Sequence, residues 1–560
     1  MIARFRRRVS VLGLVRVLLL VVVATAPPGA ALGAASARSG VATRHAAAAN
    51  VAAARAPQPA ACSVPVVTDE GVVCGVTSEG WREYLGVPYA APPTGELRWQ
   101  PPRRHAPWTS PFQATAPGPH CTSANIVPGP PSSEDCLWLN VYVPPATTTT
   151  SRLPVMVWIH GGAFRFDDDS GNGIGTGTGS GQDLADREHV IVVRISYRLG
   201  AIGFLATSGM GREAGNYGLK DQRAALQWVH RNVHAFGGNA DNVTLFGQSA
   251  GATSTCLQLI SPESRGLFQR AIIQSGWYQH FFSAASCSQN LPTVSQAEAA
   301  ARTLASRVGC SSAELVACLR RVPAETLLSA SNGLNFTPVL DGRFVPTQPQ
   351  TAFARGQFAH VPIIVGVARN EGLPNSTNTW SGYIQTVQSN YGPDAGRVLA
   401  AYPRRMFFSP TVAAGAVVSD QMVCGALAAA NRIAHWSRTY VYRWDDVTEP
   451  FYFTSTPAKG NILAGAYHSA ELTALFPGWA LPPTPQLTTP DQTAIIDTAM
   501  AYWGAFASTG GLTPEHVIPW PPYQDAESVM SIRPAYDSEV LNAAILRQTH
   551  HCTLWDSIPY

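Results

Sequence analysis

The sequence has few charged residues: aspartate, glutamate, lysine and arginine together make up 13% of its 560 residues. The formal net charge of +3 comes from the N-terminus, because residues 1–37 contain five arginines and no acidic residue. The rest of the chain is slightly acidic overall and has no basic patch. The composition therefore gives no reason to expect a nucleic-acid partner.

Metal-binding and phosphate-binding motifs are also missing. There is no CxxC pair and no histidine at ligand spacing to the cysteines, which argues against a zinc site. The glycine-rich stretch at 167–181 lacks the GK[ST] of a phosphate-binding loop and the acidic spacing of a calcium loop. We interpret it as a mobile, solvated loop, and we expect no metal or organic cofactor.

The N-terminus has the pattern of an export signal. Four arginines within the first eight residues precede an apolar run at 17–26, and 35–37 is one possible cleavage site. Arg16 interrupts the apolar run, which leaves it too short to span a bilayer comfortably. We predict a signal peptide at 1–37 and an alanine-rich flexible leader at 38–60, hence a secreted protein without a stable membrane anchor. A retained anchor is the alternative.

The chain contains ten cysteines, and in an exported protein this number favours disulfides. Three pairs are close enough in sequence to close short loops: Cys62–Cys74, Cys121–Cys136 and Cys310–Cys318. Spacing alone leaves the other four cysteines unassigned.

Apolar strands alternate with amphipathic helices from about residue 60 onward. The segment 219–238 has helical spacing, and residues 250–261 are also predicted to be helical. Strands are predicted at 154–162, 190–198, 242–247, 270–276, 361–370 and 438–446. This alternation predicts an α/β fold in which helices cover both faces of a large, mostly parallel sheet. With no internal repeat and no break in composition, 61–560 is predicted to be one domain.

Ser249 lies between two glycines in TLFGQSAGAT (244–253), after an apolar strand and at the start of a helix. A G-x-S-x-G pentapeptide can arise by chance in a chain with 48 glycines. Its position here is typical of a nucleophile on a strand–turn–helix elbow. A serine nucleophile needs a base, and on this type of fold the chain order is serine, acid, histidine. Glu371 follows a predicted strand, and His468 lies in a loop before an apolar helical stretch.

The segment WIHGGAF (158–164) also follows a predicted strand. It resembles the HGGG-type segment whose backbone N–H groups stabilise an oxyanion, and the N–H of Ala250 would add another donor. A tight turn is the alternative explanation for the two glycines.

Several motifs together resemble the type B carboxylesterases, the group that includes lipases and cholinesterases. The nucleophile signature is FGGNADNVTLFGQSAG (236–251), and EDCLWLNVYVP (134–144) resembles the second signature of the family. Other matching segments are GVPYAAPPTGELRW, YRLGAIGFL, GNYGLKDQRAALQWV, IIQSG, PVLDGRFVP and WGAFASTG. The resemblance covers about residues 65–556. It implies an α/β-hydrolase fold with insertions around the mouth of the active site.

The resemblance also implies roles for individual residues. Ser249 would be the nucleophile, Glu371 the acid and His468 the base. The oxyanion donors would be Gly162, Ala163 and Ala250, and Ser275 would support the triad. Among the cysteines, Cys121–Cys136, Cys310–Cys318 and a long-range Cys424–Cys552 pair match disulfides of the family. Cys256 and Cys287 remain unassigned.

Three departures from the family pattern bear on the substrate. Gln248 replaces the glutamate that usually precedes the nucleophile, which removes a negative charge near the base. Ala163 replaces the third glycine of the oxyanion loop, and the loop between Cys121 and Cys136 contains no aromatic residue that could bind a quaternary ammonium. Choline esters are therefore not expected as substrates.

The sequence thus predicts a secreted serine carboxylesterase that acts on small-molecule esters. Two alternatives remain open. One is a lipase or polyester hydrolase with the same triad, and the other is a catalytically silent binding or adhesion protein of the same fold.

Overall fold

The computed structural model describes residues 62–558 except 79, 124–131, 167–179, 278–285, 289, 311–313, 373–378, 448–465, 478–488 and 535–536. The predicted signal peptide at 1–37 and leader at 38–60 lie outside the described residues, as does most of the glycine-rich loop at 167–181.

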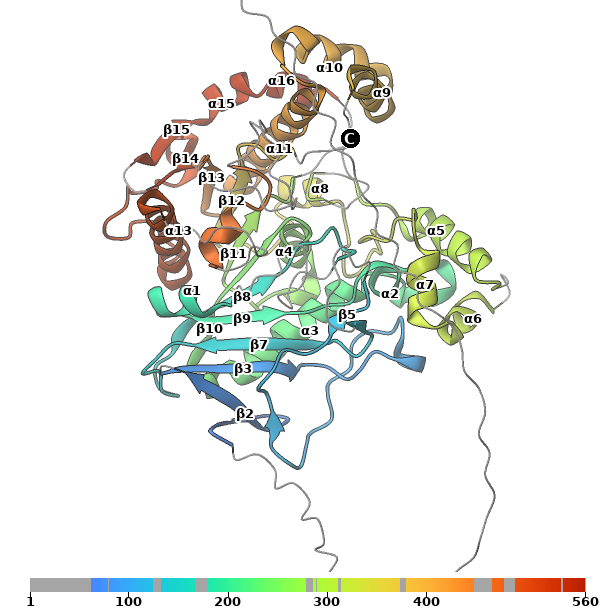
Figure 1. Cartoon of the computed structure of the whole chain (residues 1–560), viewed down its shortest axis with the longest axis vertical. Helices are drawn as coiled ribbons and strands as arrows, with labels where there is room; N and C mark the ends of the chain where they lie inside the picture. The colour runs from blue at the N-terminus through green and yellow to red at the C-terminus, as the bar shows by residue number, and fades with distance from the viewer. Residues whose placement is uncertain are drawn as a thin grey trace, which may run out of the picture. The chain divides into compact units, whose positions relative to one another are not determined.

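A 13-stranded sheet forms the centre of the fold (Figure 1). Its strand order is β1-β2-β3-β7-β9-β8-β10-β11-β12-β13-β14-β15, with β4 paired to β2, and β5 pairs separately with β6. The strands are β1 Val64–Thr68, β2 Gly71–Ser78, β3 Trp81–Pro88, β4 Phe112–Gln113, β5 His120–Cys121, β6 Ser132–Ser133, β7 Trp138–Val143, β8 Leu153–Ile159, β9 Ile191–Ile195, β10 Gly238–Gln248, β11 Arg270–Gln274, β12 Ile363–Ala368, β13 Thr439–Trp444, β14 Ser528–Ile532 and β15 Glu539–Asn542. The strands from β9 to β14 run parallel, and the antiparallel pairs lie toward both ends of the sheet.

Helices fill the connections between the strands. They are α1 Gln182–Arg187, α2 Gly200–Phe204, α3 Tyr217–Asn232, α4 Ala250–Ile260, α5 Val294–Arg307, α6 Leu315–Arg321, α7 Ala324–Ala330, α8 Pro349–Ala354, α9 Trp380–Tyr391, α10 Ala395–Ala401, α11 Pro410–Ala434, α12 Glu471–Leu475, α13 Pro490–Thr509, α14 Tyr523–Ala526, α15 Ala543–Thr549 and α16 Cys552–Asp556. The helix predicted over 219–238 ends earlier, because a 3₁₀ turn follows α3 and Gly237 then adopts a left-handed conformation.

Strand β8 shows why a central strand is largely apolar. Val155, Val157 and Ile159 belong to a core on one face of the sheet, whereas Met156 and Trp158 belong to the core on the other face. Successive side chains of a strand point to opposite faces, so a strand covered on both sides has to be apolar throughout. Residues of α3, α4 and α11 pack in the first core, and residues of α1, α12 and α13 pack in the second.

The parallel strands bring distant segments of the chain to one edge of the sheet. Ser249 follows β10, the 160–164 segment follows β8 and Glu371 follows β12. Because the carboxyl ends of parallel strands lie at the same edge, these segments are neighbours in space. The mostly parallel sheet predicted from the sequence therefore brings these candidate site segments to one edge.

Four disulfides are present among the described residues: Cys62–Cys74, Cys121–Cys136, Cys310–Cys318 and Cys424–Cys552. The last one connects α11 to α16 near the C-terminus. By length and composition α11 could cross a membrane, but 83% of its apolar window is buried inside the protein. It is therefore a core helix.

Candidate active site

Ser249 is the single residue between β10 and α4. Its backbone has φ 57° and ψ −120°, a conformation that non-glycine residues rarely adopt. Two hydrogen bonds hold it there: Ser249 N–H donates to the Gln274 carbonyl at 2.9 Å, and Thr253 N–H donates to the Ser249 carbonyl at 3.0 Å. The sharp turn and half-buried position are those of a nucleophile elbow.

The glycines on either side of this serine are required by close backbone contacts. A Cβ atom on Gly251 would lie 2.0 Å from the Ile159 carbonyl oxygen, and one on Gly247 would lie 2.5 Å from the Gly251 carbonyl oxygen. Neither position tolerates a side chain without moving the backbone. The G-x-S-x-G spacing is therefore a packing requirement of this elbow, which presses the start of α4 against the end of β8.

Glu371 and His468 are brought together by two adjacent loops. Glu371 Oε2 accepts a hydrogen bond from His468 Nδ1 at 2.5 Å, and its Oε1 accepts one from Ala368 N–H at 2.7 Å. Asn370 N–H donates to the Ala466 carbonyl at 2.8 Å, which fixes the loop before His468 beside the loop that carries Glu371. Glu371 is fully buried and His468 nearly so. With the proton on Nδ1, Nε2 of the imidazole is an acceptor.

Gln248 contacts the other nitrogen of the imidazole. Its side-chain Nε2 lies 3.1 Å from His468 Nε2, so the amide donates to the nitrogen that Glu371 leaves unprotonated. Gln248 immediately precedes Ser249 in the chain, and the contact therefore brings the imidazole to the elbow. A glutamate at position 248 would place a negative charge in direct contact with His468, whereas Gln248 places none there.

The segment after β8 forms a tight turn of left-handed residues. Gly162 has φ 94°, Ala163 has φ 54° and Phe164 has φ 58°. The Gly162 carbonyl accepts hydrogen bonds from the N–H groups of Arg165 and Phe166, both at 2.9 Å. Positive φ at an alanine costs roughly 1–2 kcal/mol that a glycine would not incur. Ala163 is thus held in this conformation by its surroundings.

This turn lies directly beside the elbow. A Cβ atom on Gly161 would come within 3.2 Å of Ser249 Cβ and 3.1 Å of the Gln248 carbonyl oxygen. Ala250 is the first residue of α4, so its N–H has no acceptor within the helix. The backbone N–H groups of Gly162, Ala163 and Ala250 are therefore candidates for binding a negatively charged oxygen next to Ser249.

Glu471 is a buried acid that the sequence reasoning missed. It lies three residues after His468 and is fully buried, and its Oε1 accepts a hydrogen bond from Gln274 Nε2 at 3.4 Å. Burial and the nearby negative charge of Glu371 raise the pKa of Glu471 to about 7. Burial and a neighbouring acid both favour the protonated form, so Glu471 keeps its proton below about pH 7. The sequence did carry a signal for this residue, because Glu471 lies only three residues after the candidate base His468.

Ser275 follows β11 and has φ 58°. Its N–H donates to the Gly366 carbonyl at 3.0 Å, and its buried hydroxyl has no hydrogen-bond partner among the described residues. Its suggested support of the triad remains a prediction.

A family model for the carboxylesterases matches residues 63–395 and 410–555. The chain belongs to the carboxylesterase family. The chain is 32% identical over 490 residues to the para-nitrobenzyl esterase of Bacillus subtilis, covering 82% of this chain and 92% of that protein. It is 40% identical over 317 residues to the acetylcholinesterase of Danio rerio, covering 52% of this chain and 47% of that protein.

Solved structures of two PNB esterases have the same fold as this carboxylesterase. One superposes with a TM-score of 0.72 at 30% identity, and a thermophilic one with a TM-score of 0.73 at 31% identity. Each comparison covers 87% of this chain and 99% of the other. The predicted α/β-hydrolase fold and family are confirmed, and the chain is a serine carboxylic-ester hydrolase.

The contact between Gln248 and His468 predicts how pH controls this carboxylesterase. In a Gln248→Glu variant a carboxylate adjoins the imidazole and favours its protonated form, which cannot act as a base. The acidic limb of the kcat/KM profile should therefore move to higher pH by roughly one unit or more. Gln248→Met is the matched control, because it removes the hydrogen bond without adding charge and should move the limb much less than the glutamate does. An unchanged limb in the glutamate variant would contradict the contact.

Glu471 predicts a pH-dependent stability. Its pKa is raised to about 7 in the folded chain from an ordinary value near 4.5. The folded state therefore binds its proton more tightly, a stabilisation that is complete below pH 4.5 and is lost as the pH rises through about 7. Glutamine cannot lose a proton, so Glu471→Gln should gain up to about 3 kcal/mol relative to wild type between pH 4.5 and 8.

Urea unfolding of both proteins across this pH range measures the difference. Glu515→Gln is the control, because the Glu515 side chain is 94% exposed and the same substitution there should add no pH-dependent term. Parallel stability curves for wild type and Glu471→Gln would show that Glu471 titrates normally.

Proposed function

We propose that Ser249, His468 and Glu371 form the catalytic triad of a secreted carboxylesterase that hydrolyses small soluble esters through an acyl-enzyme. The observation that carries the proposal is the orientation of one imidazole. Nδ1 of His468 is bonded to Glu371 at 2.5 Å, and Nε2 faces the elbow, 3.1 Å from the neighbour of Ser249. A base held in this way presents its second ring nitrogen at the elbow, and we infer that this nitrogen takes the serine proton.

In the proposed reaction, Ser249 Oγ attacks the ester carbonyl carbon while its proton passes to His468 Nε2. Glu371 keeps the imidazole in the required tautomer and stabilises its positive charge. The carbonyl oxygen becomes an oxyanion that accepts hydrogen bonds from the N–H groups of Ala250 and of the turn after β8. Each such donor is worth about 10²–10³ in rate.

The tetrahedral intermediate then collapses. The bond to the alcohol oxygen breaks, the alcohol leaves with the proton from His468, and the acyl group remains on Ser249. Water attacks the acyl-enzyme by the same route and releases the carboxylic acid. The main chain and three side chains supply every step, which is why we expect no cofactor.

A fluorophosphonate probe tests the triad. It should modify one residue per chain, and peptide mapping should place the modification on Ser249. Modification at another serine would overturn the assignment of the nucleophile. No modification of the folded protein would favour the alternative of a non-catalytic binding protein.

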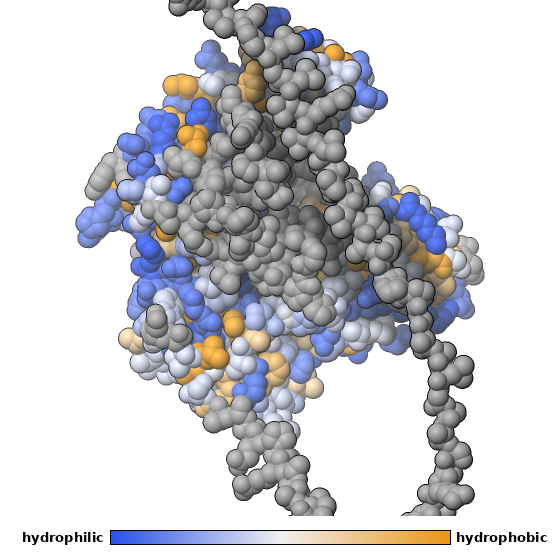
Figure 2. All heavy atoms as spheres, viewed as in Figure 1, coloured by the Kyte–Doolittle hydropathy of each residue, from blue (hydrophilic) through white to orange (hydrophobic). Residues whose placement is uncertain are grey.

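We expect soluble esters to be preferred over emulsified lipids. Figure 2 shows hydrophobic residues in small groups among hydrophilic ones on the described part of this face. The large exposed hydrophobic residues are spread along the described chain: Val67, Ile384, Met406, Phe408, Trp436, Val447, Val540 and Ile545. An enzyme that binds lipid surfaces uses a continuous apolar patch. Rates on p-nitrophenyl esters of increasing chain length, compared with emulsified triglyceride, test this preference, and a higher rate on the emulsion would favour a lipase.

Secretion is supported by the N-terminal pattern and by the four disulfides, which are typical of exported proteins. The N-terminal sequence of the mature protein in the culture medium tests it. A mature chain that starts near residue 38 is expected, and retention of residues 1–37 in a membrane fraction would favour the anchor.

A further inference from the structure

Cys256 and Cys287 are the cysteines of the described chain that lie outside the four disulfides. Cys256 is in α4, the helix that begins directly after Ser249, and Cys287 lies beyond the turn that follows β11. Both are buried, with 0% and 1% of their surface exposed. The mechanism uses neither of them.

The two thiols meet on one face of α4. Cys287 N–H donates to the Gly276 carbonyl at 3.0 Å, and Cys287 Sγ lies 3.9 Å from the Ala252 carbonyl oxygen. Ala252 is four residues before Cys256, which places both residues on the same side of the helix. Cys287 Sγ therefore lies against the turn of α4 that leads to Cys256. Two cysteines placed on one side of a helix in this way need only small side-chain movements to bring their sulfurs together.

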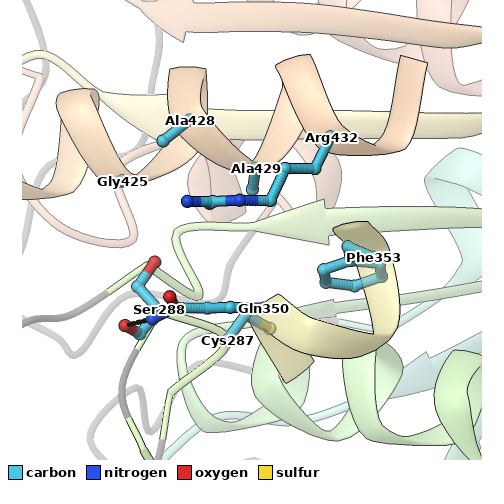
Figure 3. A pocket seen from close by; sticks show the side chains of 8 residues that line it. All are labelled: Cys287, Ser288, Gln350, Phe353, Gly425, Ala428, Ala429 and Arg432. Carbon is cyan, nitrogen blue, oxygen red and sulfur yellow. Dashed lines mark hydrogen bonds between the residues drawn. The ribbon is translucent and has the colours of Figure 1, made fainter. Parts of the chain in front are cut away.

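The surroundings of Cys287 exclude reagents once the protein has folded. Figure 3 shows Cys287 and Ser288 facing Phe353 of α8 and the residues of α11 from Gly425 to Arg432. The cavity between them is about 10 Å³, which is room for roughly one water molecule. Burial and the neighbouring sulfur raise the pKa of the Cys287 thiol well above its usual value. Since the thiolate is the reactive form, the folded dithiol is inert.

We propose that Cys256 and Cys287 are joined by a fifth disulfide that forms during folding, before α8 and α11 cover them. The four other pairs show that the chain is built for conditions in which thiols are oxidised. One thiolate attacks a small-molecule disulfide such as oxidised glutathione, which releases one glutathione and leaves a mixed disulfide. The other thiolate then attacks the protein sulfur of the mixed disulfide and displaces the second glutathione. The two cysteines lose two protons and two electrons, an S–S bond forms between their Sγ atoms, and the oxidant leaves as two thiols.

This cross-link has a defined structural consequence. It ties the chain just beyond Ser275 and Gly276 to the helix that carries Ser249 at its start. The end of β11 already holds the elbow through the bond from Ser249 N–H to Gln274. The disulfide fixes the same two segments a second time, about two turns further along α4.

Thiol counting on the refolded protein tests the proposal. The reduced, unfolded chain is refolded in a glutathione buffer, denatured with an alkylating reagent present, and digested with trypsin. Cys256 and Cys287 are each the single cysteine of their tryptic peptide, residues 232–265 and 271–302. We expect no alkylated cysteine and one species in which these two peptides are linked.

Two outcomes overturn the proposal: both peptides alkylated in the refolded enzyme, or either of them linked to a different cysteine. Cys256→Ser is the matched control and should yield one alkylated cysteine per chain, in the peptide of residues 271–302. Since the wild-type peptide map decides by itself, a variant that fails to fold leaves the test intact. The measurement is also independent of catalysis, so its result and that of the fluorophosphonate test can differ.

Discussion

Ser249→Ala is expected to lower kcat by about five to six orders of magnitude, with little change in KM or in stability. The hydroxyl is the atom that bonds to the substrate carbon, so its loss removes the acyl-enzyme route altogether. The fold should tolerate alanine, because serine and alanine are equally strained at φ 57°. The two hydrogen bonds of the elbow are made by the backbone, so the substitution leaves them in place. The oxyanion donors remain and leave about 10³–10⁴ of rate enhancement over water.

The rate of p-nitrophenyl acetate hydrolysis, measured with the urea unfolding midpoint, separates chemistry from folding. Ser254→Ala is the matched control: Ser254 lies in the same helix and its buried hydroxyl accepts a hydrogen bond from Gln222 Nε2 at 2.9 Å. That variant should lose stability but keep kcat within a few-fold. A Ser249→Ala enzyme with more than about 1% of wild-type kcat would rule out this serine as the nucleophile.

Much of the fold could be predicted because its central strands are buried on both faces. Runs such as those around Val155–Ile159 and Ile363–Ala368 are apolar at every position, and helices with one apolar stripe separate them. Strand β9 ends at Ile195, three residues before the predicted end, where its pairing with β7 stops. The antiparallel strands β1–β3 were not predicted, and β1 and β3 are partly exposed along their length.

The part of the candidate site that could be predicted is the turn at Ser249, because its shape depends on residues that are adjacent in the sequence. The two glycines around Ser249 are needed by contacts that follow from the turn itself, so the pentapeptide and its strand–helix context were sufficient to predict this turn. His468 is one of 14 histidines; its position after Glu371, in a loop before an apolar stretch, made it a candidate, and the family resemblance supports the same choice.

Contacts between distant segments could not be predicted in the same way. The contact between Gln248 and His468, the raised pKa of Glu471 and the packing of Cys287 against the helix of Cys256 all depend on how segments from different strands pack together. No local pattern of spacing encodes such contacts. Each of them affects either the charge on the base or the position of the helix that carries the nucleophile.

Glu371→Gln is expected to lower kcat by about 10³–10⁴ although it changes only one oxygen to nitrogen. Both carboxylate oxygens of Glu371 are acceptors, one for Ala368 N–H and one for His468 Nδ1. An amide has one acceptor and one donor group, so one of these contacts has to become donor against donor. If the oxygen stays with Ala368, the amide N–H faces Nδ1, and the imidazole must carry its proton on Nε2. In that tautomer it cannot take the proton of Ser249.

Steady-state kinetics at neutral pH check this prediction, and near-UV circular dichroism verifies that the site remains packed. Glu371→Asp is the matched control, because it keeps two acceptor oxygens and the negative charge that stabilises the imidazolium. We expect it to retain at least about ten times the activity of the glutamine variant. If glutamine were tolerated within tenfold of wild type, the 2.5 Å contact with Nδ1 would be structural only, and another group would have to orient His468.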